Sequence, residues 1–217
     1  GVGKGAFPHV NWGTGMVDFD NDGDRDFFIA CGHTDDNADY RDDSTKYRVA
    51  TILLMNTGNG RFVNVSDQCG SGLKPIESSR GAGFDDLDND GDIDVVILNS
   101  QAGPTILRNE SVSSNHWLDI QLRGTKANRD AVGARVTVVA GDLTQIAEVH
   151  GGRGYQGYHG SRLHFGLGNR DQIDRIEVRW PGSDTETFDG IEIDRLVTLT
   201  QGTSGQKSAD EQAASIR

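Results

Sequence analysis

Two stretches of the 217-residue chain decide its fold: residues 18–26 read DFDNDGDRD, and residues 86–94 read DLDNDGDID. The second stretch repeats the first 68 positions later, with aspartate at every odd position and Asn-Asp-Gly in the middle. Five carboxylates in nine residues repel one another, so such a loop is expected to need a hard divalent cation. The pattern therefore predicts two cation-binding loops.

The loops belong to a longer internal repeat. Residues 13–32 and 81–100 share 10 identities in 20 aligned positions. Each copy continues from the loop into two apolar strands. These strands are expected at residues 27–30 and 51–55 in the first copy and at 95–98 and 105–108 in the second. In the first copy, NTGNG at residues 56–60 predicts a hairpin turn into a further strand at 61–65.

A repeat of about 65 residues with three or four short strands cannot bury both sheet faces alone. We therefore expect the copies to stack as blades of a β-propeller. Two blades do not close a ring, which typically takes four to eight. Either further blades precede residue 1, which we expect, or a sheet edge is left open.

The first copy also carries an acidic insertion at residues 33–46. This insertion either holds another cation or is a solvated rim loop. Its candidate ligands are His33, Asp35, Asp36, Asp39, Asp42 and Asp43.

From residue 115 onward the acidic repeats stop and apolar residues alternate with polar ones, which is typical of half-buried strands. Strands are expected at residues 117–122, 132–140, 143–150, 163–167, 175–180, 185–188 and 196–200. About seven strands predict a small β-sandwich. Residues 203–217 lack apolar periodicity and are expected to form a disordered tail. The predicted fold class is all-β, with propeller blades followed by a sandwich.

The composition excludes some partners. A net charge of −12 would repel phosphate, so nucleic acid is not an expected partner. The sequence contains no apolar run of 18 residues, so no membrane span is expected. It does not open with a signal segment, and residue 1 resembles a cleavage point.

The chain contains two cysteines, Cys31 and Cys69. They allow one disulfide or two small buried thiols, and the sequence does not distinguish between these.

Calcium takes six to eight oxygen ligands, and carboxylates at loop positions one, three, five and nine can surround one ion. The glycine at position six permits the sharp turn. At position seven the backbone carbonyl is expected to bind, so Asp24 and Asp92 should point outward. The predicted metal-site residues are Asp18, Asp20, Asp22, Asp24, Asp26, Asp86, Asp88, Asp90, Asp92 and Asp94.

Other interpretations of the loops fit less well. An EF-hand needs a bidentate glutamate at position twelve, where this chain has Ile29 and Ile97 in apolar runs. A pair of solvated turns needs only one or two such polar residues each. Magnesium prefers fewer carboxylates and more water. We therefore expect two Ca²⁺ sites.

The loops resemble those of FG-GAP/VCBS repeats, the integrin-α-like propeller blades, which carry Asp-x-Asp-x-Asp-Gly-x-x-Asp between strands. The rest of the chain resembles the ASPIC/UnbV domain that follows such repeats in cartilage acidic protein and its bacterial relatives. That resemblance rests on NHWL at 115–118, NRDAVGARV at 128–136, GGRGY at 151–155, HFGLG at 164–168 and VRWPG at 178–182. The expected domains are 1–114, with FG-GAP/VCBS blades, and 115–202, the ASPIC/UnbV sandwich.

One segment departs from the family pattern. Relatives often carry Ser-Gln after the tyrosine, whereas residues 156–159 here are QGYH. The surrounding residues 153–162 mix glycine, aromatic and cationic residues and could grip an acidic sugar or a partner carboxylate. The alternative is a loop whose tyrosines cover the end of the sandwich and whose arginines pair with nearby acids.

The sequence contains no catalytic signature. Its histidines show no metal-ligand spacing; they include His116, His150, His159 and His164. Neither Ser161 nor Ser183 lies in a nucleophile elbow. We therefore expect a secreted or cell-surface, calcium-binding, non-enzymatic adhesion module that binds a protein or a glycan. The rival hypothesis is an accessory module of a polysaccharide-active enzyme, with Tyr155 and His159 as the residues to test.

Overall fold

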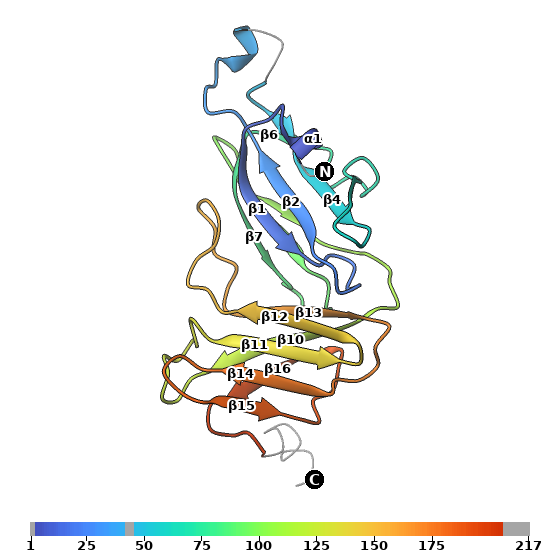
Figure 1. Ribbon diagram of the computed structural model, residues 1–217. Helices are drawn as coiled ribbons and strands as arrows, with labels where there is room; N and C mark the ends of the chain where they lie inside the picture. Colours follow the sequence, from blue (N-terminus) through green and yellow to red (C-terminus); the bar gives the residue numbers. More distant parts are fainter. Residues whose placement is uncertain (1–2, 42–45, 206–217) are drawn as a thin grey trace. The chain divides into compact units, whose positions relative to one another are not determined.

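The computed structural model describes residues 3–41 and 46–205. The prediction of an all-β fold is confirmed, because strands make up nearly all of the regular structure in these residues (Figure 1). The helical elements among them are α1 (Gly3–Ala6) and the 3₁₀ turn η1 (Ala38–Tyr40). Both are too short to contribute a core of their own.

Contacts divide the chain into two compact units. Unit 1 contains Gly1–Asp20, Asp24–Ser113 and Gly152–Gly160. Unit 2 contains Asn21–Gly23, Ser114–Gly151 and Ser161–Arg217. The expected boundary after residue 114 lies next to the division at Ser113. The sequence-based division assigns residues 21–23 to the first domain and 152–160 to the second, whereas the contacts group these two segments the other way round. From residue 206 onward, the predicted disordered tail lies outside the described residues.

Unit 1 is built from antiparallel sheets. The first has the order β1-β2-β4-β5, with β1 at Asn11–Val17, β2 at Asp26–Cys31, β4 at Ile52–Asn56 and β5 at Phe62–Asn64. The second has the order β7-β8-β9, with β7 at Ser79–Asp85, β8 at Asp94–Asn99 and β9 at Thr105–Leu107. A short pair joins β3 (Val49–Ala50) to β6 (Ile76–Glu77).

The two larger sheets repeat the same design, as the sequence repeat predicts. In each, a hairpin of two strands encloses one acidic loop, and a register shift interrupts the first strand near its start. Phe27 pairs with Leu54, and the equivalent Val95 pairs with Leu107. The residues that follow, Met55 and Arg108, therefore hold the same position in the two copies.

The core of unit 1 lies between the repeated strands. β2 is buried on both faces: Phe28 packs edge-on against Phe84, with ring centroids 5.4 Å apart, and Ile29 contributes to a separate cluster. The outer face of the second sheet is open, because Ile106 is 66% exposed and Leu98 is 45% exposed. The first repeat is therefore covered by protein on both faces and the second on one.

Glycine permits β1 and β7 to lie close together. A Cβ on Gly13 would come within 2.4 Å of the Ala82 amide nitrogen, and one on Gly15 would come within 2.3 Å of the Phe84 ring. The first contact is with backbone and the second with a buried ring. A larger residue at Gly13 would force the two strands apart, and one at Gly15 would displace the Phe84 ring.

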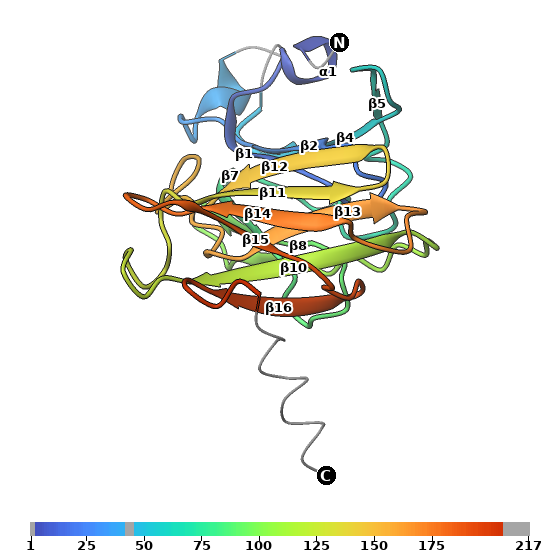
Figure 2. The same cartoon turned by 60° about the horizontal axis from the view of Figure 1, so that its bottom comes forward.

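Unit 2 is a sandwich of seven strands within residues 114–205 (Figure 2). One sheet has the order β13-β10-β16, with β10 at His116–Arg123, β13 at Leu163–Gly168 and β16 at Arg195–Thr200. The other has the order β12-β11-β14-β15, with β11 at Arg135–Ala140, β12 at Leu143–Glu148, β14 at Arg175–Arg179 and β15 at Thr185–Phe188. Side chains from both sheets form one core, which includes Leu118, Phe165, Val136 and Trp180.

Candidate metal centres

The two acidic loops share one backbone conformation. Asn21 and Asn89, at loop position four, both have φ of 60°. Gly23 and Gly91, at position six, have φ of 96° and 92°. Asparagine tolerates the left-handed region, and glycine enters it freely, so these residue types allow the chain to curl around its own carboxylates.

The aspartate at position nine closes the first loop. Asp26 is 1% exposed. Its Oδ2 accepts a hydrogen bond of 3.0 Å from the Phe19 amide at the start of the loop, and its Oδ1 accepts one of 2.7 Å from the Asn56 amide on the neighbouring strand. A carboxylate that joins both ends of the loop to β4 is structural whether or not it also binds a cation.

Asp94 repeats this arrangement in the second loop. Its Oδ2 accepts from the Leu87 amide at 3.1 Å, and its Oδ1 accepts from the Asn109 amide at 2.8 Å. Each carboxylate oxygen has about two acceptor directions, so one amide hydrogen bond leaves room for a metal ligand bond. Position nine can therefore both hold the loop and face an ion.

The aspartate at position one organises the interior of the second loop. Asp86 is fully buried. Its Oδ1 accepts from the Asn89 amide at 2.7 Å and the Asp90 amide at 3.2 Å, while its Oδ2 accepts from the Gly91 amide at 2.9 Å. Three backbone donors on one carboxylate fix its orientation toward the centre of the loop.

Each loop gathers three carboxylates whose possible ligand atoms all lie within 4.8 Å of one another. The groups are Asp18, Asp20 and Asp22 in the first loop and Asp86, Asp88 and Asp94 in the second. Two oxygens bound to one calcium ion at 2.3–2.6 Å are at most about 5 Å apart. Both groups meet this limit, and their oxygen-only donors fit a hard cation.

The four other predicted ligands lie outside these groups. Asp24 and Asp26 complete the first loop, and Asp90 and Asp92 complete the second. Asp24 is exposed, and the Asp92 amide donates to Asp90 Oδ1 at 3.0 Å. Ligation by all ten aspartates therefore stays a prediction, while the geometry gathers six of them.

Sequence patterns did not predict that Arg108 lies beside the second loop. One of its terminal nitrogens lies 2.8 Å from Asp88 Oδ2 and 3.3 Å from Asp90 Oδ2, and its Nε lies 3.2 Å from Glu110 Oε1. The hydrogen bond to Asp90 and the charges of Asp88 and Glu110 raise the pKa of Arg108 above its usual value. No signal within the loop sequence could have identified this residue, because strand pairing brings it there.

Two protein-family models match the chain, one over the acidic loops and one over the sandwich. An FG-GAP-like repeat model matches residues 18–97, which contain both loops. A model described as ASPIC and UnbV matches residues 124–206. The chain therefore carries an FG-GAP-like repeat region followed by an ASPIC/UnbV domain. A search of the curated proteins gave no match.

A buried polar network involves residue 21 of the first FG-GAP loop, which groups with unit 2. His164 Nε2 lies 2.7 Å from Asn21 Oδ1, and its Nδ1 lies 2.8 Å from Asp119 Oδ1. Asp119 is fully buried, and Arg162 approaches its other oxygen at 3.4 Å. His164 is therefore held by hydrogen bonds on both ring nitrogens. Among the described residues, the metal-capable groups consist of aspartates, without histidine.

The acidic insertion of the first repeat forms local contacts. Arg41 pairs with Asp35 at 2.7 Å, and Asp39 Oδ1 accepts from the Tyr47 amide at 2.8 Å. Asp42 and Asp43 lie outside the described residues. In the part of the insertion that the structure describes, no three acids come together as they do in the FG-GAP loops.

The glycine-rich segment from the ASPIC/UnbV part of the sequence groups with unit 1 at Gly152–Gly160. The Tyr155 ring lies on Trp12, with centroids 4.8 Å apart, and the His159 ring meets Phe84 edge-on at 4.8 Å. The alternative in which the tyrosines of this segment cover the end of the sandwich is therefore wrong for Tyr155. Burial, and then the charge of Arg153, lower the pKa of His159.

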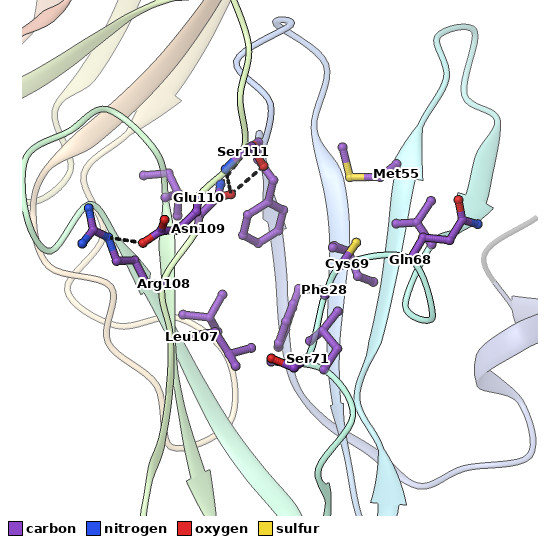
Figure 3. Close-up of a pocket in the computed structure, with 18 of the residues that line it drawn as sticks. Phe28, Met55, Gln68, Cys69, Ser71, Leu107, Arg108, Asn109, Glu110 and Ser111 are labelled. Atoms are coloured by element: carbon purple, nitrogen blue, oxygen red, sulfur yellow. Dashed lines mark hydrogen bonds and ion pairs between the residues drawn. The ribbon is translucent and has the colours of Figure 1, made fainter.

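A pocket of about 810 Å³ lies between the two FG-GAP repeats, within unit 1 (Figure 3). Phe28 and Leu107 are among its apolar lining residues, and Cys69 lies in its wall. The structure answers the open question about the cysteines, since both Cys31 and Cys69 are free thiols. Burial raises the pKa of the Cys31 thiol to about 12.

None of the helices in the described residues is long and apolar enough to cross a bilayer.

Proposed function

We propose that the chain is a secreted or cell-surface interaction module that binds two calcium ions and presents its loops to a protein or glycan without catalysing a reaction. The observation that carries the proposal is the pair of three-carboxylate groups in equivalent loops of a repeated fold. The FG-GAP and ASPIC/UnbV matches support an interaction module.

The cation would act on the structure rather than on a substrate. In the first loop Asp18, Asp20 and Asp22 would hold it, and in the second Asp86, Asp88 and Asp94. A bound dication offsets the repulsion between these side chains and so fixes each loop between its two strands. Loops fixed in this way would be rigid, which lowers the entropy cost of binding a partner.

The chemistry of the loops also supports an extracellular location. Extracellular modules bind calcium with dissociation constants of roughly 10⁻⁴ to 10⁻³ M. Partly exposed sites assembled from a short acidic loop suit that range, since Asp22 and Asp88 are exposed in their groups. Such sites would fill in a calcium-rich extracellular fluid.

Calorimetric titration of the whole chain with calcium tests the metal part of the proposal. We expect two ions per chain, and one ion per chain for either Asp20→Asn or Asp88→Asn. Glu192→Gln on unit 2 serves as a charge-matched control and should still bind two. A flat titration of the unmodified chain would remove the proposal.

Partner class requires a second experiment. A glycan array and a panel of extracellular-matrix proteins should be probed with the unmodified chain in calcium and again in chelator. We expect binding that depends on calcium and is lost in the Asp20→Asn, Asp88→Asn double variant. Turnover of an acidic polysaccharide, abolished by Tyr155→Phe, would favour the enzyme-accessory hypothesis instead.

A further inference from the structure

Arg108 carries a positive charge, whereas its counterpart in the first repeat, Met55, is apolar. It directly follows β9, and strand register makes it equivalent to Met55 at the corresponding point of β4. The amides of the next residues, Asn56 and Asn109, donate to the position-nine aspartates at 2.7 and 2.8 Å. The backbone is thus the same in both copies, while one side chain is an apolar thioether and the other a cation.

The guanidinium of Arg108 contacts two aspartates of the second loop. The same terminal nitrogen lies 2.8 Å from Asp88 Oδ2 and 3.3 Å from Asp90 Oδ2. Asp88 belongs to the three-carboxylate group of this loop. Figure 3 shows Arg108 and Met55 at opposite sides of the pocket between the repeats. The cation therefore reaches the metal group of its own repeat.

The carboxylate sets of the two loops differ at the position that Arg108 touches. Asp22, at position five, belongs to the first group, whereas the equivalent Asp90 is outside the second. Asp90 Oδ2 faces Arg108, and Asp90 Oδ1 accepts from the Asp92 amide at 3.0 Å. Both oxygens of Asp90 therefore contact residues outside the three-carboxylate group. The third member of that group is Asp94, at position nine.

We propose that Arg108 is a built-in competitor for calcium at the second loop, where its guanidinium holds Asp88 and Asp90 oxygens that a dication would otherwise take. The inference rests on the proposed calcium binding and deepens it. Arg108 lowers calcium affinity at this loop in two ways: it occupies ligand oxygens, and it repels the incoming charge. In return it holds the acidic side chains together when calcium is scarce. The pKa of Arg108, raised by the same carboxylates, agrees with this contact.

The size of the effect follows from the charges. A single positive charge and a dication a few ångströms apart in water repel by an amount equal to about a tenfold change in a binding constant. Because Arg108 and Asp88 are 58% and 36% exposed, salt screens this repulsion. The competition should therefore be strong at low ionic strength and weak at high ionic strength.

The test is a calcium titration of the full chain followed by NMR, with the Gly23 and Gly91 amides as separate reporters of the two loops. Arg108→Met copies the residue of the first repeat and should tighten calcium binding at Gly91 about tenfold in 0.1 M salt. In 1 M salt the gain should shrink to about threefold or less. The Gly23 titration should change less than twofold.

Two further variants sharpen the result. Met55→Arg brings the cation to the first repeat and should weaken calcium binding at Gly23 while leaving Gly91 unchanged. Arg48→Met removes an equal charge from unit 1, where Arg48 pairs with Glu77 at 3.9 Å, and should change neither titration by more than twofold.

The outcomes separate the two proposals. If both glycines titrate in the unmodified chain but Arg108→Met leaves Gly91 unchanged or weakens its titration, Arg108 is no competitor and only this inference fails. An equal gain from Arg48→Met would also overturn it, since general charge would then explain the effect. If neither glycine titrates in any variant, the calcium proposal itself fails.

Discussion

The two acidic loops share a sequence pattern and a backbone, yet they gather different carboxylates. Both place asparagine at φ of 60°, and their glycines have φ of 96° and 92°. The first gathers the aspartates at positions one, three and five, and the second those at positions one, three and nine. The loop sequence therefore determines the turn, while Arg108, a residue outside the loop, contacts two carboxylates of the second loop.

The surroundings of the loops also differ. Asn21 is 3% exposed and contacts His164 at 2.7 Å, whereas the equivalent Asn89 is exposed. Asn21 groups with unit 2 and Asn89 with unit 1. A repeat can thus place the same residue type at the same φ in two environments, and only one of the two asparagines is part of a buried network.

The largest effect is expected from Asp86→Ala. This change leaves three backbone N–H donors without their acceptor inside the second loop, which should cost about 3 kcal/mol or more of unfolding free energy. Chemical denaturation should show this loss in chelator, and a larger loss in calcium, because Asp86 would also hold the ion. A loss confined to calcium would mean that the amide hydrogen bonds contribute little.

Asp119→Ala should have the next largest effect, and it perturbs the environment of the first loop alone. Removing the fully buried carboxylate leaves His164 and Arg162 without their shared partner, at a cost of about 3 kcal/mol to unit 2. In NMR spectra the Gly23 amide should shift while Gly91 stays in place. Equal shifts at both glycines would contradict a network specific to Asn21.

Asp90→Ala tests whether Asp90 contributes to calcium binding in the second loop, by comparing stability in calcium with stability in chelator. If Asp90 completes the site when calcium displaces Arg108, its loss should reduce the stabilisation that calcium gives, by about 1 kcal/mol. In chelator the change removes an exposed ion pair and an exposed hydrogen bond from the Asp92 amide, so the melting temperature should change less than in calcium. Asp22→Ala provides the matched variant in the first loop. Equal losses in calcium and chelator would show that Asp90 acts without the metal.

The smallest effect concerns pH. Phe84 in the second repeat is covered by His159, while its counterpart in the first, Met16, is 53% exposed. Burial keeps the pKa of His159 below its usual 6.5, so the unfolded chain binds this proton at a higher pH than the folded chain. Stability from neutral His159 is therefore fully present above pH 6.5 and is lost as the pH falls through the folded-state pKa.

His159→Phe should make stability less dependent on pH in this window, because phenylalanine keeps a ring on Phe84 but takes up no proton. Thermal unfolding of both proteins between pH 7.5 and 5 measures the difference. An identical pH dependence in the two proteins would show that His159 does not titrate differently on folding.

Sequence reasoning predicted much of the fold because apolar runs and turn residues are local signals. Strand β4 at Ile52–Asn56 and the sandwich strands of unit 2 appear close to their expected positions. Strands β1 and β7 were not predicted, since Gly13, Gly15 and Gly81 interrupt any apolar alternation. Those glycines instead permit close backbone contacts, which depend on residues far along the chain.

The candidate site was also predictable only where its signals are local. The two loops were evident from spacing alone, but Arg108 lies 18 residues from Asp90 and reaches it only through the pairing of β8 with β9. Likewise, nothing local indicates that Tyr155 lies on Trp12. Contacts set by strand register and by long-range packing leave no trace in a short sequence pattern.

The most direct test of the account is anomalous X-ray scattering from crystals grown with calcium. The account predicts two calcium peaks, one among Asp18, Asp20 and Asp22 and one among Asp86, Asp88 and Asp94. Anomalous maps without a peak at either group, from crystals in which the loops are ordered at saturating calcium, would contradict it.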